Sequence, residues 1–342
     1  MSPTLRRSMD RDVMWSLARA ASSRSSIARE IDVDPHPESL PTPDPRLETV
    51  TANCASALWE VLALGTHILG WSGETQPKDD HEIPRLLLLR RMLDLLHGVH
   101  AQIRAAQSDA ASITARAILE HSAQIQWLAR NRDSRVQYAF LVWSIHEEIE
   151  HYERIDPETH QGKLVAERVS RDSRLASFRF SRPDLSRERV AFLRSILETP
   201  GYAEAEAEYQ RIPSGPNGRR KPLRWYALFD GPRNVEQLFE RLAKAGQYEL
   251  EYRPLSRIVH GSEVVVGSLI GHGEEGGAIV QLAWPRSAAY ITMTVSAESL
   301  ALFEEYMARY CKIRTPEYRD AAAEVARRVK AHVDAASAIR LW

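Results

Sequence analysis

The sequence predicts an all-α protein, a multi-helix bundle with a short irregular or β-like segment near 278–283. From residue 47 to about residue 175, the chain divides into consecutive helical segments, each with its own start or stop signal. Such a series favours antiparallel packing in a bundle. No P-loop motif is present, and no Gly-x-Gly-x-x-Gly or Gly-x-Ser-x-Gly lies in a strand–turn–helix context, which argues against the common α/β folds.

Composition narrows the class of protein. The 342 residues suffice for one large helical domain or two smaller ones. The formal net charge of −1 gives no overall attraction to nucleic acid or membrane, so any nucleic-acid contact would be a local patch. Cys54 and Cys311 offer neither a disulfide framework nor a zinc spacing. No signal peptide or membrane-spanning run is recognisable, and we expect a cytoplasmic protein without a membrane partner.

The first half of the chain is predicted as a terminal segment followed by helices. Residues 1–45, rich in Ser, Arg and Pro, are expected to be poorly ordered, with a weak helix near 10–30. A single helical-bundle domain follows at 46–313. Its first helix is expected to stop at Gly70 and Gly73, and Pro84 opens the second. The predicted helices are 47–69, 85–106, 110–130 (capped by Ser108 or Asp109), 135–155 (capped by Asp133 or Ser134) and 156–175.

The second half begins with a basic insertion at about 168–224. Arginines dominate it, Phe178 and Phe180 interleave, and an acidic helix around 204–208 and a loop at 213–222 follow. Helices are predicted again at 233–245 and 247–270, before a glycine-rich break at 271–277. The chain closes with helices at 286–312 and 316–340, and residues 314–342 are expected to pack on the bundle as a C-terminal helix.

The pair Arg116 and Glu120 is the first candidate for a functional site. The two residues lie one turn apart on a segment that is otherwise almost apolar, and about 100° per residue places Gln124 and Trp127 on the same side. A helix that is apolar nearly all round is expected to be buried, and buried charges need partners. The pair therefore predicts a polar stripe inside the core. The alternative is a simple intrahelical salt bridge, although Arg before Glu is the weaker orientation.

A second polar cluster lies at residues 252–262. Ser256 and His260 are four residues apart and share a helix face, while Tyr252, Arg253 and Arg257 are close by in sequence. The segment could present hydroxyl, guanidinium and imidazole groups together. The alternative is that His260 is a core histidine bonded to a neighbouring helix. The site hypothesis requires the helix at 110–130 to pack against the helix that begins near Pro254.

Other readings of the polar residues are weaker. Arg253 and His260 fit the loose Arg-x4–6-His spacing of helical RNA-cleaving toxins, whereas Arg116 and His121 point about 140° apart on a helix. One Glu-x-x-His, Glu148 to His151, is present where a diiron bundle needs two. We therefore expect no metal and no cofactor, and read the acidic face there as solvated: His146, Glu147, Glu150 and Glu153.

At these two clusters the chain resembles an uncharacterised bacterial all-helical family, which pairs Arg-x-x-x-Glu (Arg116, Glu120) with Tyr-x-x-x-Ser-x-x-x-His (Tyr252, Ser256, His260). The resemblance covers roughly residues 50–310. The architecture of the chain is also similar to that of helical RNA-cleaving toxin domains. More faintly, it resembles the actinobacterial seryl transferases of valanimycin biosynthesis, which move a seryl group from charged tRNA to a hydroxylamine.

The resemblance implies aminoacyl transfer from aminoacyl-tRNA to a small amine or hydroxylamine in specialised metabolism. His260 would be the base, Glu120 would hold His260 or the acceptor, and Arg116 or Tyr252 would stabilise the oxyanion, with Ser256 beside them. The alternatives are RNA cleavage and a non-enzymatic helical module, and a homodimer is compatible with each. The expected tRNA-binding residues are Arg179, Arg182, Arg219, Arg220 and Lys221.

Overall fold

The computed structural model describes residues 45–74, 83–131, 133–175, 183–211, 224–259, 269–270, 278–279 and 287–339. The chain divides into two units, Met1–Asp44 and Pro45–Trp342, and every described residue belongs to the second unit. The predictions for residues 1–44 and for the loop at 213–222 lie outside the described residues.

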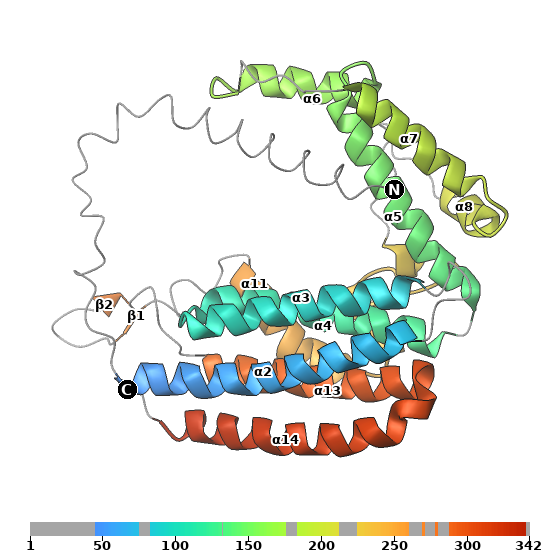
Figure 1. The fold of residues 1–342 in the computed structure, drawn as a ribbon. Coiled ribbons are helices and arrows are strands. Elements are labelled where there is room, and N and C mark those ends of the chain that lie inside the picture. Colours follow the sequence, from blue (N-terminus) through green and yellow to red (C-terminus); the bar gives the residue numbers. More distant parts are fainter. Residues whose placement is uncertain are drawn as a thin grey trace. The chain divides into compact units, whose positions relative to one another are not determined.

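The all-α prediction is confirmed, and five long helices form the main core. They are α2 (Pro45–Glu74), α3 (Ile83–Arg104), α4 (Ser108–Arg130), α13 (Ala288–Tyr310) and α14 (Thr315–Ser337). Helix α3 packs against both α2 and α4, and α13 packs against α4, α2 and α14 (Figure 1). Helix α14 also lies along α2. None of the helices in the described ranges is apolar over a stretch long enough to cross a membrane.

One glycine shows how closely three of these helices approach one another. A Cβ atom on Gly65 of α2 would lie 2.5 Å from Leu93 Cδ2 of α3 and 2.6 Å from Phe303 Cζ of α13. Both side chains belong to the buried apolar core. The absence of a side chain at residue 65 therefore lets α2 dock between α3 and α13 with close packing.

Helix ends differ from the prediction where side chains override the usual signals. Helix α2 runs past Gly70 and Gly73 to Glu74, so the predicted stop was wrong; Ser72 is buried there and donates to the Ile68 carbonyl at 2.8 Å. A helical glycine costs only about 1 kcal/mol, which this packing can offset. Helix α4 has no side-chain cap, because Ser108 is already inside the helix. Asp133 does cap α5, and its side chain accepts from the Arg135 N–H.

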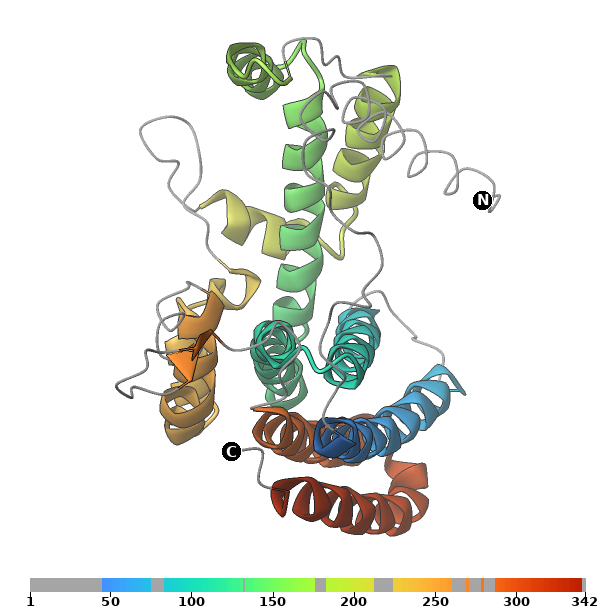
Figure 2. The same cartoon turned by 90° about the vertical axis from the view of Figure 1, so that its left-hand side faces the viewer.

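A second apolar cluster joins α5 (Ser134–Ile155) to α7 (Pro183–Leu197) and α8 (Ala203–Gln210), with α6 (His160–Arg171) packed on α5 (Figure 2). The predicted helix at 156–175 begins later than expected, because Thr159 caps it through the Gly162 N–H at 2.9 Å. Helix α7 lies inside the predicted basic insertion. Its apolar residues face α5, so this part of the insertion is an ordinary amphipathic helix. The buried residues of this second apolar cluster are Val142, Ile149, Leu193, Leu197, Tyr202 and Ala205.

The segment after residue 224 contains short elements that cover one side of α4. They are η4 (Trp225–Ala227), α9 (Val235–Arg241), α10 (Ala245–Gln247), the π-helix η5 (Tyr248–Tyr252) and α11 (Arg253–Val259). Both α9 and α11 contact α4.

The predicted helix at 247–270 was wrong at its end, because β1 (Leu269–Ile270) is a strand. It pairs antiparallel with β2 (Ala278–Ile279), which lies where a short β-like segment was expected. The remaining residues of 271–283 lie outside the described part of the chain.

Candidate functional site

The polar stripe of α4 lies on the side of the helix that meets the segment after residue 224. Arg116, Glu120 and Gln124 occur at successive four-residue steps, and all three are half-buried. The other side carries the fully buried Ile118 and Ile125. The stripe thus faces a protein surface that still admits solvent, rather than the closed interior expected from the apolar sequence.

Tyr252 connects the two charged residues of the stripe. Nη2 of Arg116 donates to the Tyr252 hydroxyl at 2.8 Å, and that hydroxyl lies 3.3 Å from Oε2 of Glu120, to which it donates. The Arg116 guanidinium carbon also lies 5.1 Å from the centroid of the Tyr252 ring. Among the ion pairs of the described residues, none joins Arg116 directly to Glu120. The stripe is therefore not a simple intrahelical salt bridge, and its charges are linked through a tyrosine on another element.

The surroundings of this tyrosine favour its protonated form. Only 5% of Tyr252 is exposed. Burial, and after it the Glu120 carboxylate, raise the pKa of Tyr252 to about 12, although Arg116 opposes both effects. At neutral pH Tyr252 is consequently a hydrogen-bond donor rather than a base.

A second tyrosine, Tyr226, adds to this environment. Burial, and then the charge of Glu120, raise the pKa of Tyr226. The Tyr226 hydroxyl and the Nε of Arg116 are buried without a hydrogen-bond partner among the described residues. An unsatisfied buried donor costs about 1–3 kcal/mol, so these two groups are candidates to bind a ligand oxygen.

Aromatic rings hold the tyrosine in place. The Tyr248 ring stacks on the Tyr252 ring at 5.3 Å between centroids, and Phe239 lies 5.6 Å from Tyr252. Further along the stripe, Trp225 Nε1 donates to Gln124 Oε1 at 3.3 Å. Tyr252 ends the π-helix, and the Arg253 N–H bonds to the Tyr248 carbonyl five residues back. Short π-helical turns often occur at functional sites because they redirect one side chain.

The structure brings together some of the predicted site residues. Arg116, Glu120 and Tyr252 are in contact, and the required contact between α4 and α11 is present. Ser256 is half-buried one turn after Tyr252 on α11, where Arg253 is exposed and pairs with carboxylates of its own segment. The remaining predicted site residues lie outside the described residues: His260, Arg179, Arg182, Arg219, Arg220 and Lys221.

A further polar cluster, which the sequence did not predict, is centred on Glu298 of α13. Its carboxylate is 5% exposed and accepts from Lys244 Nζ at 2.8 and 3.0 Å. Gln247 donates to it at 2.7 Å and Gln126 at 2.9 Å, and Ser122 also donates to it. The signal was available, since Glu298 is the first carboxylate in the apolar first half of α13. Applied to α13, the argument that singled out Glu120 would have found it.

Three arginines of the basic insertion, all on α7, are matched by carboxylates of α5 and its C-terminal end. The pairs Arg187–Asp156, Arg189–Glu148 and Arg194–Glu153 have N–O distances of 2.7, 2.8 and 2.7 Å. Arginines committed in this way are less available to phosphates. The described part of the insertion is therefore less basic in effect than its sequence suggests.

The acidic face of α5 is not simply solvated. His146 is half-buried, stacks on Tyr209 at 4.0 Å between ring centroids and bonds to Glu206 at 2.7 Å. Within the described ranges, no three His, Cys, Asp or Glu side chains are grouped so that they could hold a metal ion.

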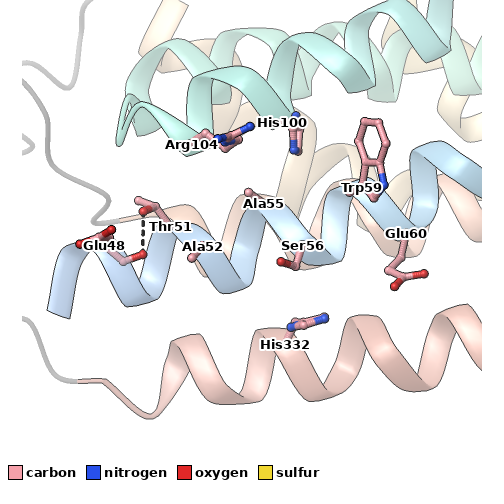
Figure 3. Close-up of a pocket in the computed structure, with 10 residues that line it drawn as sticks. All are labelled: Glu48, Thr51, Ala52, Ala55, Ser56, Trp59, Glu60, His100, Arg104 and His332. Atoms are coloured by element: carbon pink, nitrogen blue, oxygen red, sulfur yellow. Dashed lines mark hydrogen bonds between the residues drawn. The ribbon is translucent and has the colours of Figure 1, made fainter. Parts of the chain in front are cut away.

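A cavity of about 670 Å³ lies over the small residues Ala52, Ala55 and Ser56 of α2 (Figure 3). The exposed Trp59 of α2 and the half-buried His100 of α3 line it from the two facing helices, with ring centroids 5.6 Å apart. Its remaining charged and titratable lining residues are Glu48, Glu60, Arg104 and His332, so charges of both signs oppose one another there. None of the residues predicted for the site lines this cavity.

Comparison with known proteins covers the middle of the chain. Residues 82–278 match the model of a family of unknown function, DUF5677. The match spans more than half of the chain and includes Arg116, Glu120 and Tyr252, but not Glu298. No curated protein and no solved structure matches the chain.

Proposed function

We propose that Arg116, Glu120 and Tyr252 form a group-transfer site. The chain that carries them belongs to the DUF5677 family of unknown function. The reaction is transfer of an aminoacyl group, seryl in its most specific form, from an aminoacyl-tRNA to a small amine or hydroxylamine. The observation that supports it most is the Tyr252 hydroxyl, which lies between a guanidinium and a carboxylate on a half-buried face. This arrangement offers donors and an acceptor at one place, as acyl transfer requires.

The chemistry needs only modest assistance because the ester is already activated. The acceptor's lone pair attacks the ester carbonyl carbon, a bond to the acceptor forms, and the bond between that carbonyl carbon and the ribose oxygen breaks. The proton of the acceptor passes to a base and then to the leaving ribose hydroxyl. We assign the base to His260, and Glu120 orients either His260 or the acceptor's amino group. Ser256, which is half-buried on α11, is a further polar group assigned to this site.

Arg116 and Tyr252 are the proposed oxyanion donors. Tyr252 carries its proton at neutral pH, as an ordinary tyrosine does, and burial raises its pKa further, which suits a donor. The buried Nε of Arg116 and the Tyr226 hydroxyl provide further N–H and O–H groups for a developing negative charge. Removal of one such donor typically lowers kcat by about 10²–10³-fold.

The tRNA contacts are proposed for the basic residues that the sequence singled out: Arg179, Arg182, Arg219, Arg220 and Lys221. The arginines of α7 are left out of this set, because each of them already forms an ion pair with a carboxylate.

A second candidate is a non-enzymatic helical module. It is favoured by the hydrogen bonds that link Arg116, Tyr252 and Glu120, which would stabilise the packing of the π-helix η5 on α4 without any ligand. RNA cleavage is the remaining alternative, and the same experiment separates all three.

The test incubates purified protein with charged and uncharged tRNA, with and without a small amine or hydroxylamine, and follows both the RNA and the amino acid. Acceptor-dependent loss of the amino acid with intact RNA supports transfer, and shortened RNA supports cleavage. No change in either contradicts both enzymatic functions.

Matched variants link any activity to the site. Glu120→Gln and Tyr252→Phe should lower transfer strongly. Glu150→Gln and Tyr152→Phe, at two half-buried positions of α5, carry the same changes elsewhere and should transfer normally. Equal rates in all four variants would place the activity at another site.

A further inference from the structure

The buried carboxylate of Glu298 holds together two segments that are far apart in sequence. On α4 it accepts from Ser122 and Gln126, and on the segment before the π-helix it accepts from Lys244 and Gln247. A carboxylate has about four lone-pair sites, so these donors use its capacity fully. Glu298 therefore sets the distance between α4 and the residues that lead into the π-helix.

That leading segment needs to be held, because it turns sharply. Ala243 has a φ of 60°, in the left-handed region that L-residues avoid, and it places Lys244 immediately before α10. Arg130 of α4 donates to the Leu242 carbonyl at 2.9 Å, so the start of the turn is fixed as well. Gln247, the last residue before the π-helix, also donates to Glu251 at 2.9 Å, within that helix.

Gln247 thus transmits the position of Glu298 to the π-helix. It lies five residues before Tyr252, which is one hydrogen-bonded step of such a helix. A rotation of this short element would move the Tyr252 hydroxyl away from Arg116 and Glu120 together, since both residues bond to that single hydroxyl.

We infer that Glu298 is a positioning residue, which acts through Gln247 to hold the π-helix so that the Tyr252 hydroxyl stays between Arg116 and Glu120. The inference rests on the proposed function for the claim that Tyr252 is a working group. It extends the site beyond residues 82–278, because Glu298 lies on α13.

The direct test is the nuclear magnetic resonance spectrum of the full chain carrying ring-labelled tyrosine, recorded at neutral pH. The Tyr252 resonance is the one that Tyr252→Phe removes. In Gln247→Met, which keeps a side chain of similar length but cuts the link, we expect this resonance to shift or broaden. In Glu298→Gln we expect the same change. The matched control is Gln237→Met on α9, whose side chain accepts from the Arg233 N–H at 2.9 Å and should leave Tyr252 unmoved.

A purely structural role for Glu298 predicts a different result. Gln247→Met would then lower the melting temperature while the Tyr252 resonance stayed in place, and that result overturns the inference. If Glu298→Gln does not fold, Gln247→Met decides alone, because it leaves Lys244, Ser122 and Gln126 on the carboxylate. A second readout compares kcat with KM in Gln247→Met. A positioning role lowers kcat by about tenfold or more and changes KM little.

Failure of the inference and failure of the proposed function give different patterns. A shifted Tyr252 resonance in Gln247→Met, with no transfer by the natural chain, supports the positioning role and rejects aminoacyl transfer. Transfer by the natural chain, with an unmoved resonance in Gln247→Met, supports the function and rejects the positioning role.

Discussion

Two faces of helix α4 take part in polar clusters, one around Glu120 of α4 itself and one around Glu298 of α13. The carboxylates of the two clusters differ in how many hydrogen bonds they accept. Glu298 is almost completely buried and accepts from Ser122, Gln126, Lys244 and Gln247. Glu120 is half-buried, and the hydrogen bond that reaches it from the described residues is the long one from Tyr252. A saturated carboxylate is a structural link, whereas one with spare acceptor capacity near solvent can engage a ligand.

The largest expected difference between the two clusters is in stability. Lys244→Met leaves the Glu298 carboxylate buried without its cation and should lower the free energy of unfolding by about 3 kcal/mol. Glu120→Gln should lower it by less than about 1 kcal/mol, because Glu120 is half-buried and Gln can still accept from Tyr252. Urea denaturation of both variants measures this contrast. Equal losses would show that the two clusters do the same structural work.

Activity should show the opposite ranking. Tyr252→Phe removes the shared hydroxyl and should reduce aminoacyl transfer by about 100-fold, while it costs about 1 kcal/mol of stability. The rate is measured with charged tRNA and an amine acceptor, alongside a melting curve. A variant that unfolds in proportion to its loss of activity would contradict a specific role for this hydroxyl.

Alkaline pH should weaken the cluster of Arg116, Glu120 and Tyr252. The ordinary pKa of tyrosine is near 10, and in the folded chain the pKa of Tyr252 is raised to about 12. Its contribution to stability is therefore complete below pH 10 and is lost as the pH rises through 12. The unfolding free energy of Tyr252→Phe should decline less steeply over this range than that of the natural chain. Parallel pH profiles would mean that other buried tyrosines account for the whole decline.

The smallest effect is expected far from α4. Arg194 and Glu153 form an ion pair whose arginine side chain is largely exposed, and Arg194→Ala should change the unfolding free energy by less than about 0.5–1 kcal/mol. The same variant should transfer aminoacyl groups at the normal rate. A large loss in either measurement would show that the α5–α7 contacts influence the site.

Local signals explain how much of this fold could be predicted. The helical segments and the Asp133 cap follow from residues close together in sequence, and they match the structure. The end of α2 does not, because the helix continues through both glycines to Glu74, with Ser72 buried between them. Arg116 and Glu120 were noticeable as charges on an apolar helix, but Tyr252 is 136 residues from Arg116, and sequence spacing alone cannot establish that contact.

Glu298 was missed for a related reason. Its partners come from α4 and from the turn around Lys244, and none of them is near it in the chain. A lone carboxylate among apolar residues was visible, yet nothing local identified what would satisfy it. The π-helix was invisible as well, because its hydrogen bonds differ from those of an α-helix by one residue in register.

That extra residue in the π-helix makes the site sensitive to helical register rather than to composition. An α-helical turn would close one residue earlier, so the same residues wound as an α-helix would have one residue left over. Every side chain after them would then turn by about 100° relative to α4. Tyr252 would face away from Arg116 and Glu120 although each residue of the site were still present. The spacing between Gln247 and Tyr252 is thus as much a part of the site as the identities of these side chains.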